Sequence, residues 1–151
     1  MKKFAKVMAV ALVAVLAIAL LAACGPASDP QKALDALKKN GYTTTGSAIA
    51  ADDALSKAAC DAQGVLLGVK SGELIAMISG SKLAEKDDDV DGEMVVIYYF
   101  SSSSAAKTAW EGTFMKNMRS EAEKADDDDA VIKLSGSMIF FGTKDGVKAA
   151  R

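Results

Sequence analysis

The stretch Glu93-Met94-Val95-Val96-Ile97-Tyr98-Tyr99-Phe100 decides the fold, because it is the strongest strand signal in the chain. Successive side chains of a strand point to opposite faces of its sheet. Here both faces are apolar, with Val95, Ile97 and Tyr99 on one and Met94, Val96, Tyr98 and Phe100 on the other. We therefore expect this strand at the centre of a sheet. Either helices lie on both sides of that sheet, or a second molecule covers one side.

Weaker signals on either side of this strand predict the other elements. Turn residues and β-branched or apolar runs predict strands over residues 42–47, 73–79, 130–134 and 137–141. Caps and apolar spacing predict helices over residues 30–39, 103–125 and 144–150, and another from residue 52 to Gly64 or Gly68. The last two strands form a hairpin across Ser135-Gly136. This order predicts an α+β fold, a single small domain with a mixed or antiparallel sheet of about four to five strands covered by helices.

The apolar spacing within two helices predicts which side of each faces the sheet. The helix that starts near residue 52 would bury a stripe at helical spacing, Leu55, Ala58, Ala59 and Ala62. The helix over residues 103–125 would bury Ala106, Trp110, Phe114 and Met118. We expect it to continue through Gly112, at a cost of about 1 kcal/mol relative to alanine.

The N-terminus has three parts in the order typical of an export signal. Lys2, Lys3 and Lys6 form a basic start, and an apolar run over residues 7–23 follows, shorter than the roughly 20 residues that span a bilayer comfortably. The run ends in Leu21-Ala22-Ala23-Cys24, after which Gly25 and Pro26 stop any helix. This segment resembles bacterial lipoprotein precursors, whose lipobox has Leu, two small residues and then Cys.

The resemblance implies a processed, lipid-anchored protein. Signal peptidase would recognise Leu21, Ala22 and Ala23 and cut before Cys24, whose sulfur would carry a diacylglyceryl group. Residues 1–23 would then be the signal peptide, residues 24–29 the lipidated cysteine and a short tether, and residues 30–151 the domain. We expect the mature protein on the extracytoplasmic face of the cell membrane. An uncleaved transmembrane anchor and a secretory signal cut elsewhere are the alternatives.

Charge and composition exclude several partners and reactions. Without Lys2, Lys3 and Lys6 the chain has 15 basic and 20 acidic residues, a formal charge of −5. That net charge disfavours nucleic acid and anionic lipid headgroups as partners of the domain surface. The chain has no histidine, so it lacks the usual general base and the commonest nitrogen ligand of zinc. We expect no cofactor and no enzymatic activity.

Cys60 is the second of two cysteines and has no intramolecular partner if Cys24 carries a lipid. It is either a small buried residue on a helix or, outside the cytoplasm, a reactive thiol or half of an intermolecular disulfide.

Two acidic segments raise the question of a cation site. Asp87, Asp89, Asp91 and Gly92 match the start of a calcium loop, where alternate carboxylates converge on one ion. The twelfth position is Tyr98, however, where an EF-hand has glutamate, and a solvated acidic turn explains the pattern as well. Residues 126–129 are four consecutive aspartates, which mutual repulsion favours as an exposed loop.

These observations lead us to expect a lipid-anchored envelope protein that is a binding or interaction module for a protein or small molecule. Its sheet face would contribute Tyr98, Tyr99, Phe140 and Phe141, whose other role is to fill the core. The alternatives are a calcium-responsive structural module built on residues 87–91 and an extracytoplasmic enzyme that uses carboxylates and a divalent cation.

Overall fold

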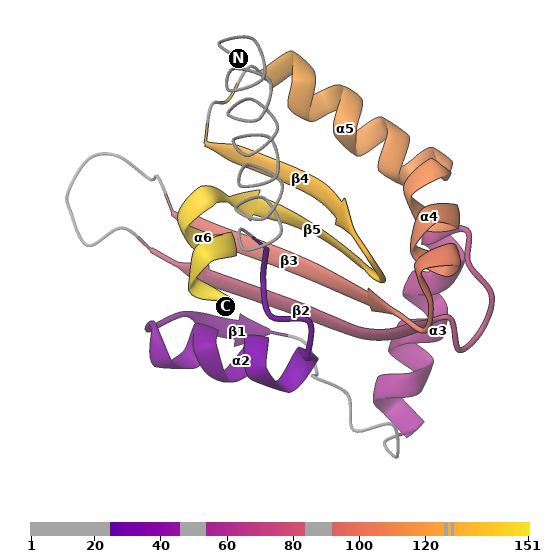
Figure 1. The fold of residues 1–151 in the computed structure, drawn as a ribbon, viewed down its shortest axis with the longest axis horizontal. Coiled ribbons are helices and arrows are strands. Elements are labelled where there is room, and N and C mark those ends of the chain that lie inside the picture. The colour runs from indigo at the N-terminus through magenta and orange to yellow at the C-terminus, as the bar shows by residue number, and fades with distance from the viewer. Residues whose placement is uncertain (1–24, 46–53, 84–91, 126, 128) are drawn as a thin grey trace, which may run out of the picture.

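The computed structural model describes residues 25–45, 54–83, 92–125, 127 and 129–151. In these ranges the chain forms five strands, β1 (Thr43–Thr45), β2 (Leu74–Lys82), β3 (Glu93–Phe100), β4 (Ala130–Ser135) and β5 (Met138–Thr143). It also forms five helices, α2 (Pro30–Lys39), α3 (Ala54–Leu67), α4 (Ser103–Glu111), α5 (Thr113–Ala125) and α6 (Lys144–Ala149). Figure 1 shows a single domain in which the strands make one open sheet.

The sheet is antiparallel throughout, with strand order β1-β2-β3-β5-β4. The central position predicted for residues 93–100 is confirmed, because β3 lies between β2 and β5. Ile97 pairs with Ile78 of β2 on one side and with Phe140 of β5 on the other. The expected hairpin is also present, and its second strand runs two residues further than predicted, to Thr143. The α+β fold predicted from the sequence is therefore confirmed.

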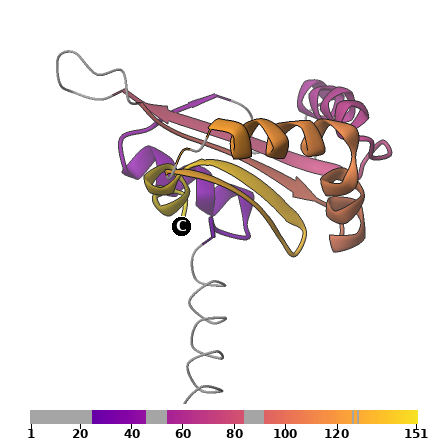
Figure 2. The ribbon, with the colours of Figure 1, turned by 90° about the horizontal axis from the view of Figure 1, so that it is seen from above.

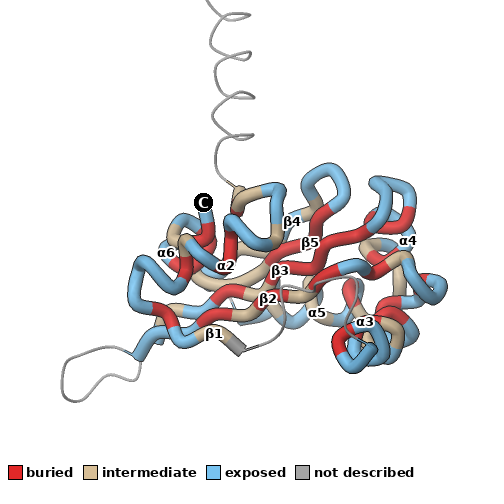
Figure 3. Tube along the Cα trace, turned by 90° about the horizontal axis from the view of Figure 1, so that it is seen from below, coloured by how far each residue is buried: buried red, intermediate tan, exposed pale blue. Residues whose placement is uncertain are grey.

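Helices cover both faces of the sheet, so the structure needs no second molecule to bury β3 (Figure 2). Val95, Ile97 and Tyr99 pack with the buried residues of α2 and α6, and we call this side the α2/α6 face. Tyr98 and Phe100 pack with residues of α3, α4 and α5, and we call this side the α3–α5 face. In Figure 3 the middle strands are largely buried, whereas the helices expose their outer sides.

Helix α2 has the predicted bounds, because both of its ends are capped. The Asp29 side chain accepts a hydrogen bond from the backbone N–H of Lys32 at 3.0 Å, and Pro30 occupies the first turn. At the other end the side chain of Asn40 donates to the backbone oxygens of Ala36 and Ala149, at 2.9 and 3.0 Å. The second bond joins the end of α2 to the end of α6.

The expected continuous helix over residues 103–125 is wrong, because the chain breaks at Gly112. The backbone of Gly112 is extended, with φ −67° and ψ 159°, and ends α4 before α5 begins. A side chain at this position would come within 3.1 Å of the backbone oxygen of Leu67 at the end of α3. Glycine suits that close approach, because a Cβ atom would make its neighbours shift by a few tenths of an ångström, and α4 and α5 meet at an angle that Figure 1 shows clearly.

The buried side predicted for the helix near residue 52 is also wrong. All four residues of the predicted stripe are exposed, Leu55, Ala58, Ala59 and Ala62, and 81% of the surface of Leu55 is accessible to solvent. Helix α3 instead buries a stripe on its other side, Ser56, Cys60, Gly64 and Leu67. A Cβ atom on Gly64 would lie 3.3 Å from a methyl group of Val69, in the segment between α3 and β2, and 3.7 Å from the Cβ atom of Leu74 on β2. The small glycine thus lets this side of the helix pack against the segment that follows it.

The segment expected to be a tether lies against the domain rather than away from it. Pro26 is buried, and the N–H of Ala27 donates to the backbone oxygen of Ala150 at 2.8 Å. The Tyr99 hydroxyl donates to the backbone oxygen of Ala27 at 2.8 Å. Gly25 lies over Phe140, whose ring is 3.5 Å from the position of a Cβ atom on Gly25. In Figure 1 this indigo segment crosses the α2/α6 face between the two helices.

Candidate functional site

A groove of about 620 Å³ lies between α5 and the edge of the sheet formed by β4 and the end of β5. Most of its lining is apolar, and the residues come from α4, α5 and three strands. They are Met94, Trp110, Met118, Arg119, Ala122, Glu123, Asp127, Ala130, Val131, Ile132, Phe141, Gly142 and Thr143. This combination of concave apolar walls and a few polar groups is typical of a ligand pocket.

The break at Gly112 creates the groove. Of the residues of α5, only Met115 is fully buried, and it anchors the start of the helix in the core. The following turns present Met118 and Ala122, which are half-buried, toward β4 and β5. Phe141 on β5 is also half-buried, and its ring lies 5.9 Å from the ring of Tyr98. These apolar side chains are therefore positioned by the core without being covered by it.

Arg119 is the basic residue of the lining, and Trp110 holds it in place. The centre of its guanidinium group lies 4.1 Å from the centre of the Trp110 ring, a cation–π contact. Its Nη2 atom donates to the backbone oxygen of Trp110 at 3.1 Å. No carboxylate that the structure describes lies within ion-pair distance of Arg119. The remaining guanidinium donors can thus bond to a ligand in the groove.

A second, smaller pocket of about 280 Å³ lies on the α2/α6 face, and its lining is mostly polar. It lies between the ends of α2 and α6, where the Tyr42 hydroxyl donates a hydrogen bond to the Glu93 carboxylate. Burial raises the pKa of Tyr42 well above its ordinary value, and the Glu93 hydrogen bond and charge raise it further. A hydroxyl that holds its proton so firmly is a poor general base at neutral pH.

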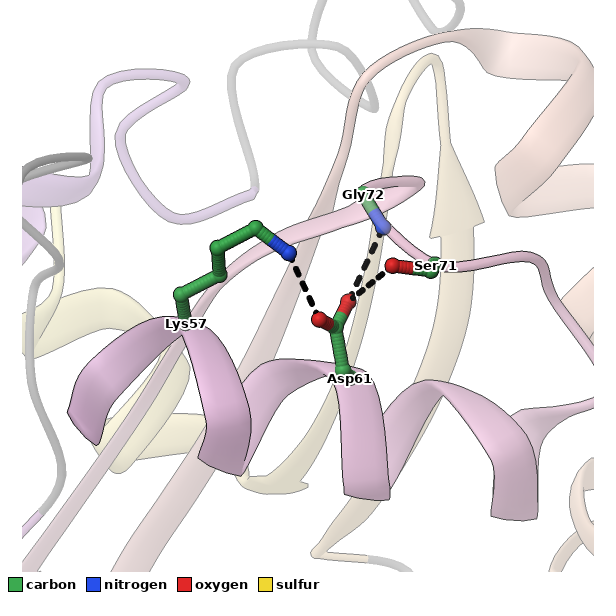
Figure 4. Close-up of polar contacts among 4 residues, drawn as sticks. All are labelled: Lys57, Asp61, Ser71 and Gly72. Atoms are coloured by element: carbon green, nitrogen blue, oxygen red, sulfur yellow. Dashed lines mark hydrogen bonds and ion pairs between the residues drawn. The ribbon is translucent and has the colours of Figure 1, made fainter. Parts of the chain in front are cut away.

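Asp61 forms the densest polar cluster in the described ranges, and the cluster is structural (Figure 4). Its carboxylate accepts from Lys57 Nζ at 2.6 Å, from Ser71 Oγ at 2.9 Å and from the Gly72 N–H at 3.0 Å. The Lys57 hydrogen bond, followed by those of Gly72 and Ser71, lowers the pKa of Asp61. Because three donors already occupy it, this carboxylate fixes α3 to the turn before β2.

Most site residues predicted from the sequence fall outside the described ranges. These are the lipobox residues Leu21, Ala22, Ala23 and Cys24 and the acidic residues Asp87, Asp89 and Asp91. In the parts of the chain that the structure does describe, no three acidic or cysteine side chains are grouped so that they could hold a metal ion. No helix in those parts has the length and hydrophobicity needed to cross a bilayer.

Cys60 is buried on α3, as one of the two sequence interpretations expected. Burial raises the pKa of its thiol, and the neighbouring Asp61 charge raises it further. A raised pKa leaves less of the reactive thiolate at neutral pH, so Cys60 has the properties of a packing residue.

The four aromatic residues proposed for the sheet face have different environments. Tyr98, Tyr99 and Phe140 are buried in the core, and only Phe141 reaches the groove. The sequence did not predict a role for Arg119, because nothing distinguishes a single basic residue on an exposed helix from its neighbours.

Comparisons with protein-family models, with curated proteins and with solved structures found no match for this chain. Function therefore has to be inferred from the site itself.

Proposed function

We propose that this chain is a lipid-anchored, extracytoplasmic binding protein that holds an apolar ligand in the groove beneath α5. The lipobox at residues 21–24 supports the anchor. The groove supports the binding role, because its walls combine half-buried Trp110, Met118 and Phe141 with a volume suited to a small molecule. This groove is the observation that carries the proposal.

The gain from covering these walls favours binding. Apolar surface removed from water contributes roughly 25 cal/mol per Å². Trp110, Met118 and Phe141 are held at the surface by their neighbours, so a ligand gains this free energy without reorganising the core. Arg119 would orient the ligand in the groove, because a charge-assisted hydrogen bond to an acceptor on the ligand is stronger than one between neutral groups. The best ligand thus has an apolar body and an anionic or strongly accepting end.

The lining favours binding over catalysis. The sequence has no histidine, and the hydroxyl in the groove, that of Thr143, caps α6 by accepting from the N–H of Gly146 at 3.1 Å. Glu123 and Asp127 lie at the exposed rim. These groups do not form a nucleophile and base within hydrogen-bond reach of each other, which covalent catalysis requires.

The anchor is tested by replacing the lipidated residue in cells. In the Cys24→Ser variant, processing should stop and the protein should lose its lipid and its membrane association. The measurement is the intact mass and membrane fractionation of the native protein and the variant. A native protein that keeps residues 1–23, or a variant that fractionates and is processed like the native protein, would contradict the anchor.

The groove is tested by fluorescence, since Trp110 is the only tryptophan of the chain. The mature chain with Cys24→Ser is titrated with dodecanoate, dodecanol and dodecylammonium below their micelle concentrations. We expect a saturable change in Trp110 emission that is strongest for dodecanoate, because its head pairs with Arg119. Ala122→Phe fills the groove and should weaken binding at least about tenfold, equivalent to about 1.4 kcal/mol.

The matched control is Ser120→Phe, which adds the same ring to an exposed position of α5 outside the lining. It should leave the titration unchanged. The proposal fails if none of the three amphiphiles gives a saturable signal, or if both phenylalanine variants weaken binding equally. A preference for dodecylammonium would show that Glu123 and Asp127, and not Arg119, select the ligand.

A further inference from the structure

The place where the anchor joins the domain is fixed by contacts of residues 25–29. The backbone of Ala27 is held from both directions, by the Ala150 oxygen and by the Tyr99 hydroxyl, each at 2.8 Å. Pro26 is buried, and Gly25 lies against Phe140. Residue 24 is one residue away from this contact, and one residue spans at most about 3.6 Å. A lipid on Cys24 would therefore leave the domain directly at the α2/α6 face.

Charge is distributed unevenly between the two faces. The helices and flanking residues of the α2/α6 face expose six basic side chains, Lys32, Lys38, Lys39, Lys144, Lys148 and Arg151. They expose three acidic ones, Asp29, Asp35 and Asp145. These helices and flanking residues together have a formal charge of +3, although the mature chain as a whole has a charge of −5. The negative net charge of the chain therefore does not apply to this face, which is basic.

These six basic residues also form no ion pair with any residue that the structure describes. All the ion pairs among the described residues lie on the α3–α5 face, and they are Lys57–Asp61, Lys107–Glu111 and Lys124–Glu121. Unpaired lysines around an attachment point are suited to anionic lipid headgroups.

From these observations we propose that the α2/α6 face is a docking surface for an anionic lipid bilayer. The inference rests on the lipid anchor at Cys24 proposed above and adds an orientation to it. With this face against the headgroups, α3, α4 and α5 lie on the far side of the sheet (Figure 2). The groove beneath α5 then opens away from the membrane, where a ligand reaches it from the aqueous side.

The test uses an anchor made by chemistry, so that it does not depend on processing in cells. The chain from residue 24 is coupled through the Cys24 thiol to a maleimide lipid in vesicles; Cys60 is buried and reacts slowly. Vesicles of phosphatidylcholine alone are compared with vesicles containing 30% phosphatidylglycerol. A water-soluble amine reagent then labels the lysines, and mass spectrometry measures the labelling rate of each.

We expect Lys39 and Lys148 to be labelled at least about fivefold more slowly on the anionic vesicles than on the uncoupled protein. Lys107 and Lys116, which are exposed on α4 and α5, should keep their rates. The charge-reversed variant Lys39→Glu/Lys148→Glu should lose protection of Lys32, one of the lysines of this face that it leaves in place. The control Lys107→Glu/Lys116→Glu changes the net charge equally and should keep it.

Protection of Lys116, or equal protection on all sides, would overturn the proposed orientation. Protection of Lys39 that is equally strong on phosphatidylcholine would overturn the role of anionic headgroups, because the tether alone would then orient the domain. Failure of the Cys24 anchor itself shows up separately, in the cellular Cys24→Ser experiment. The two proposals can therefore fail independently.

Discussion

Replacing Leu67 by alanine should destabilise the domain far more than the same change at Leu66, its neighbour on α3. Leu67 keeps 1% of its surface exposed and packs in the core beneath α4 and α5, whereas Leu66 keeps 61%. Both substitutions have the same effect on helix propensity, and both lie in the last turn of the same helix. The difference between them therefore isolates burial.

The expected magnitudes follow from the environment of each side chain. Leu67→Ala removes a fully buried side chain and leaves a cavity in the core cluster that also contains Met115 and Leu74, so we expect a loss of about 3 kcal/mol in the free energy of unfolding. Leu66→Ala should change it by less than about 0.5 kcal/mol. For a domain of this size, the first corresponds to a fall of roughly 10 °C in Tm.

The assay is urea denaturation of the mature chain with Cys24→Ser, followed by Trp110 fluorescence and by circular dichroism. With a slope of about 2 kcal/mol per molar urea, Leu67→Ala should lower the midpoint by roughly 1.5 M, and Leu66→Ala should hardly move it. Equal losses for the two variants, or a larger loss for Leu66→Ala, would show that α3 is rotated on the sheet. The reasoning on the α3 face would then be refuted.

The remaining predictions concern backbone space and pH. Gly142→Ala should cost at least about 3 kcal/mol in the same urea assay, because φ is +150° and a Cβ atom would come within 2.7 Å of the Cα of Val95. Gly136→Ala, at φ +59° with open space around it, should cost only about 1 kcal/mol, and similar losses at the two glycines would contradict the argument. Burial, assisted by the Asp29 charge, raises the pKa of Tyr99 above its ordinary value of 10.0, so its contribution to stability is complete below about pH 10 and is lost at higher pH. Tyr99→Phe should lower stability by about 1 kcal/mol at pH 7 through the lost Ala27 hydrogen bond, and should make the fall above pH 10 shallower; an unchanged alkaline slope would count against this role.

The sheet could be predicted because the residues of its central strand indicate by themselves that both faces of the strand are covered. Both faces of residues 93–100 are apolar, and a position between two strands and two helix layers buries five of the eight residues, Val95 and Ile97 to Phe100. The caps of α2 were likewise local, since Asp29 and Pro30 act within one turn of the helix that they start. Features that depend on neighbouring residues could be identified from the sequence.

The buried side of α3 could not be predicted, because the helix has two apolar stripes. Leu55, Ala58 and Ala62 give one, while Cys60 and Leu67 with Gly64 give the other. Hydrophobicity favours the first, yet the second is buried, and its Gly64 approaches Val69, which follows the helix, and Leu74 of β2. That approach depends on residues of another element, which periodicity does not contain.

The groove could not be predicted from the sequence for a related reason. Trp110 and Arg119 are nine residues apart, and at 3.6 residues per turn they would lie on opposite sides of one straight helix. The extended backbone at Gly112 redirects the chain and brings the guanidinium group over the ring. A sequence that reads as one helix thus gives no sign of a contact that only two helices can make. The lipobox, by contrast, remains a prediction from residues 21–24.

The position of β5 has a consequence for how the protein is made. Strand β5 lies between β3 and β4, although its residues follow those of both in the chain. A ribosome delivers residues 93–100 and 130–135 before residues 138–143, so β3 has an empty edge until the last strand emerges. Val96 and Tyr98 keep unpaired backbone groups on that side during this interval, as the parity of the Phe100 N–H bond to Ser137 shows. The proposed export signal bears on this interval, because a chain exported unfolded would not hold the half-built sheet inside the cell, where its open edge could pair with a second chain.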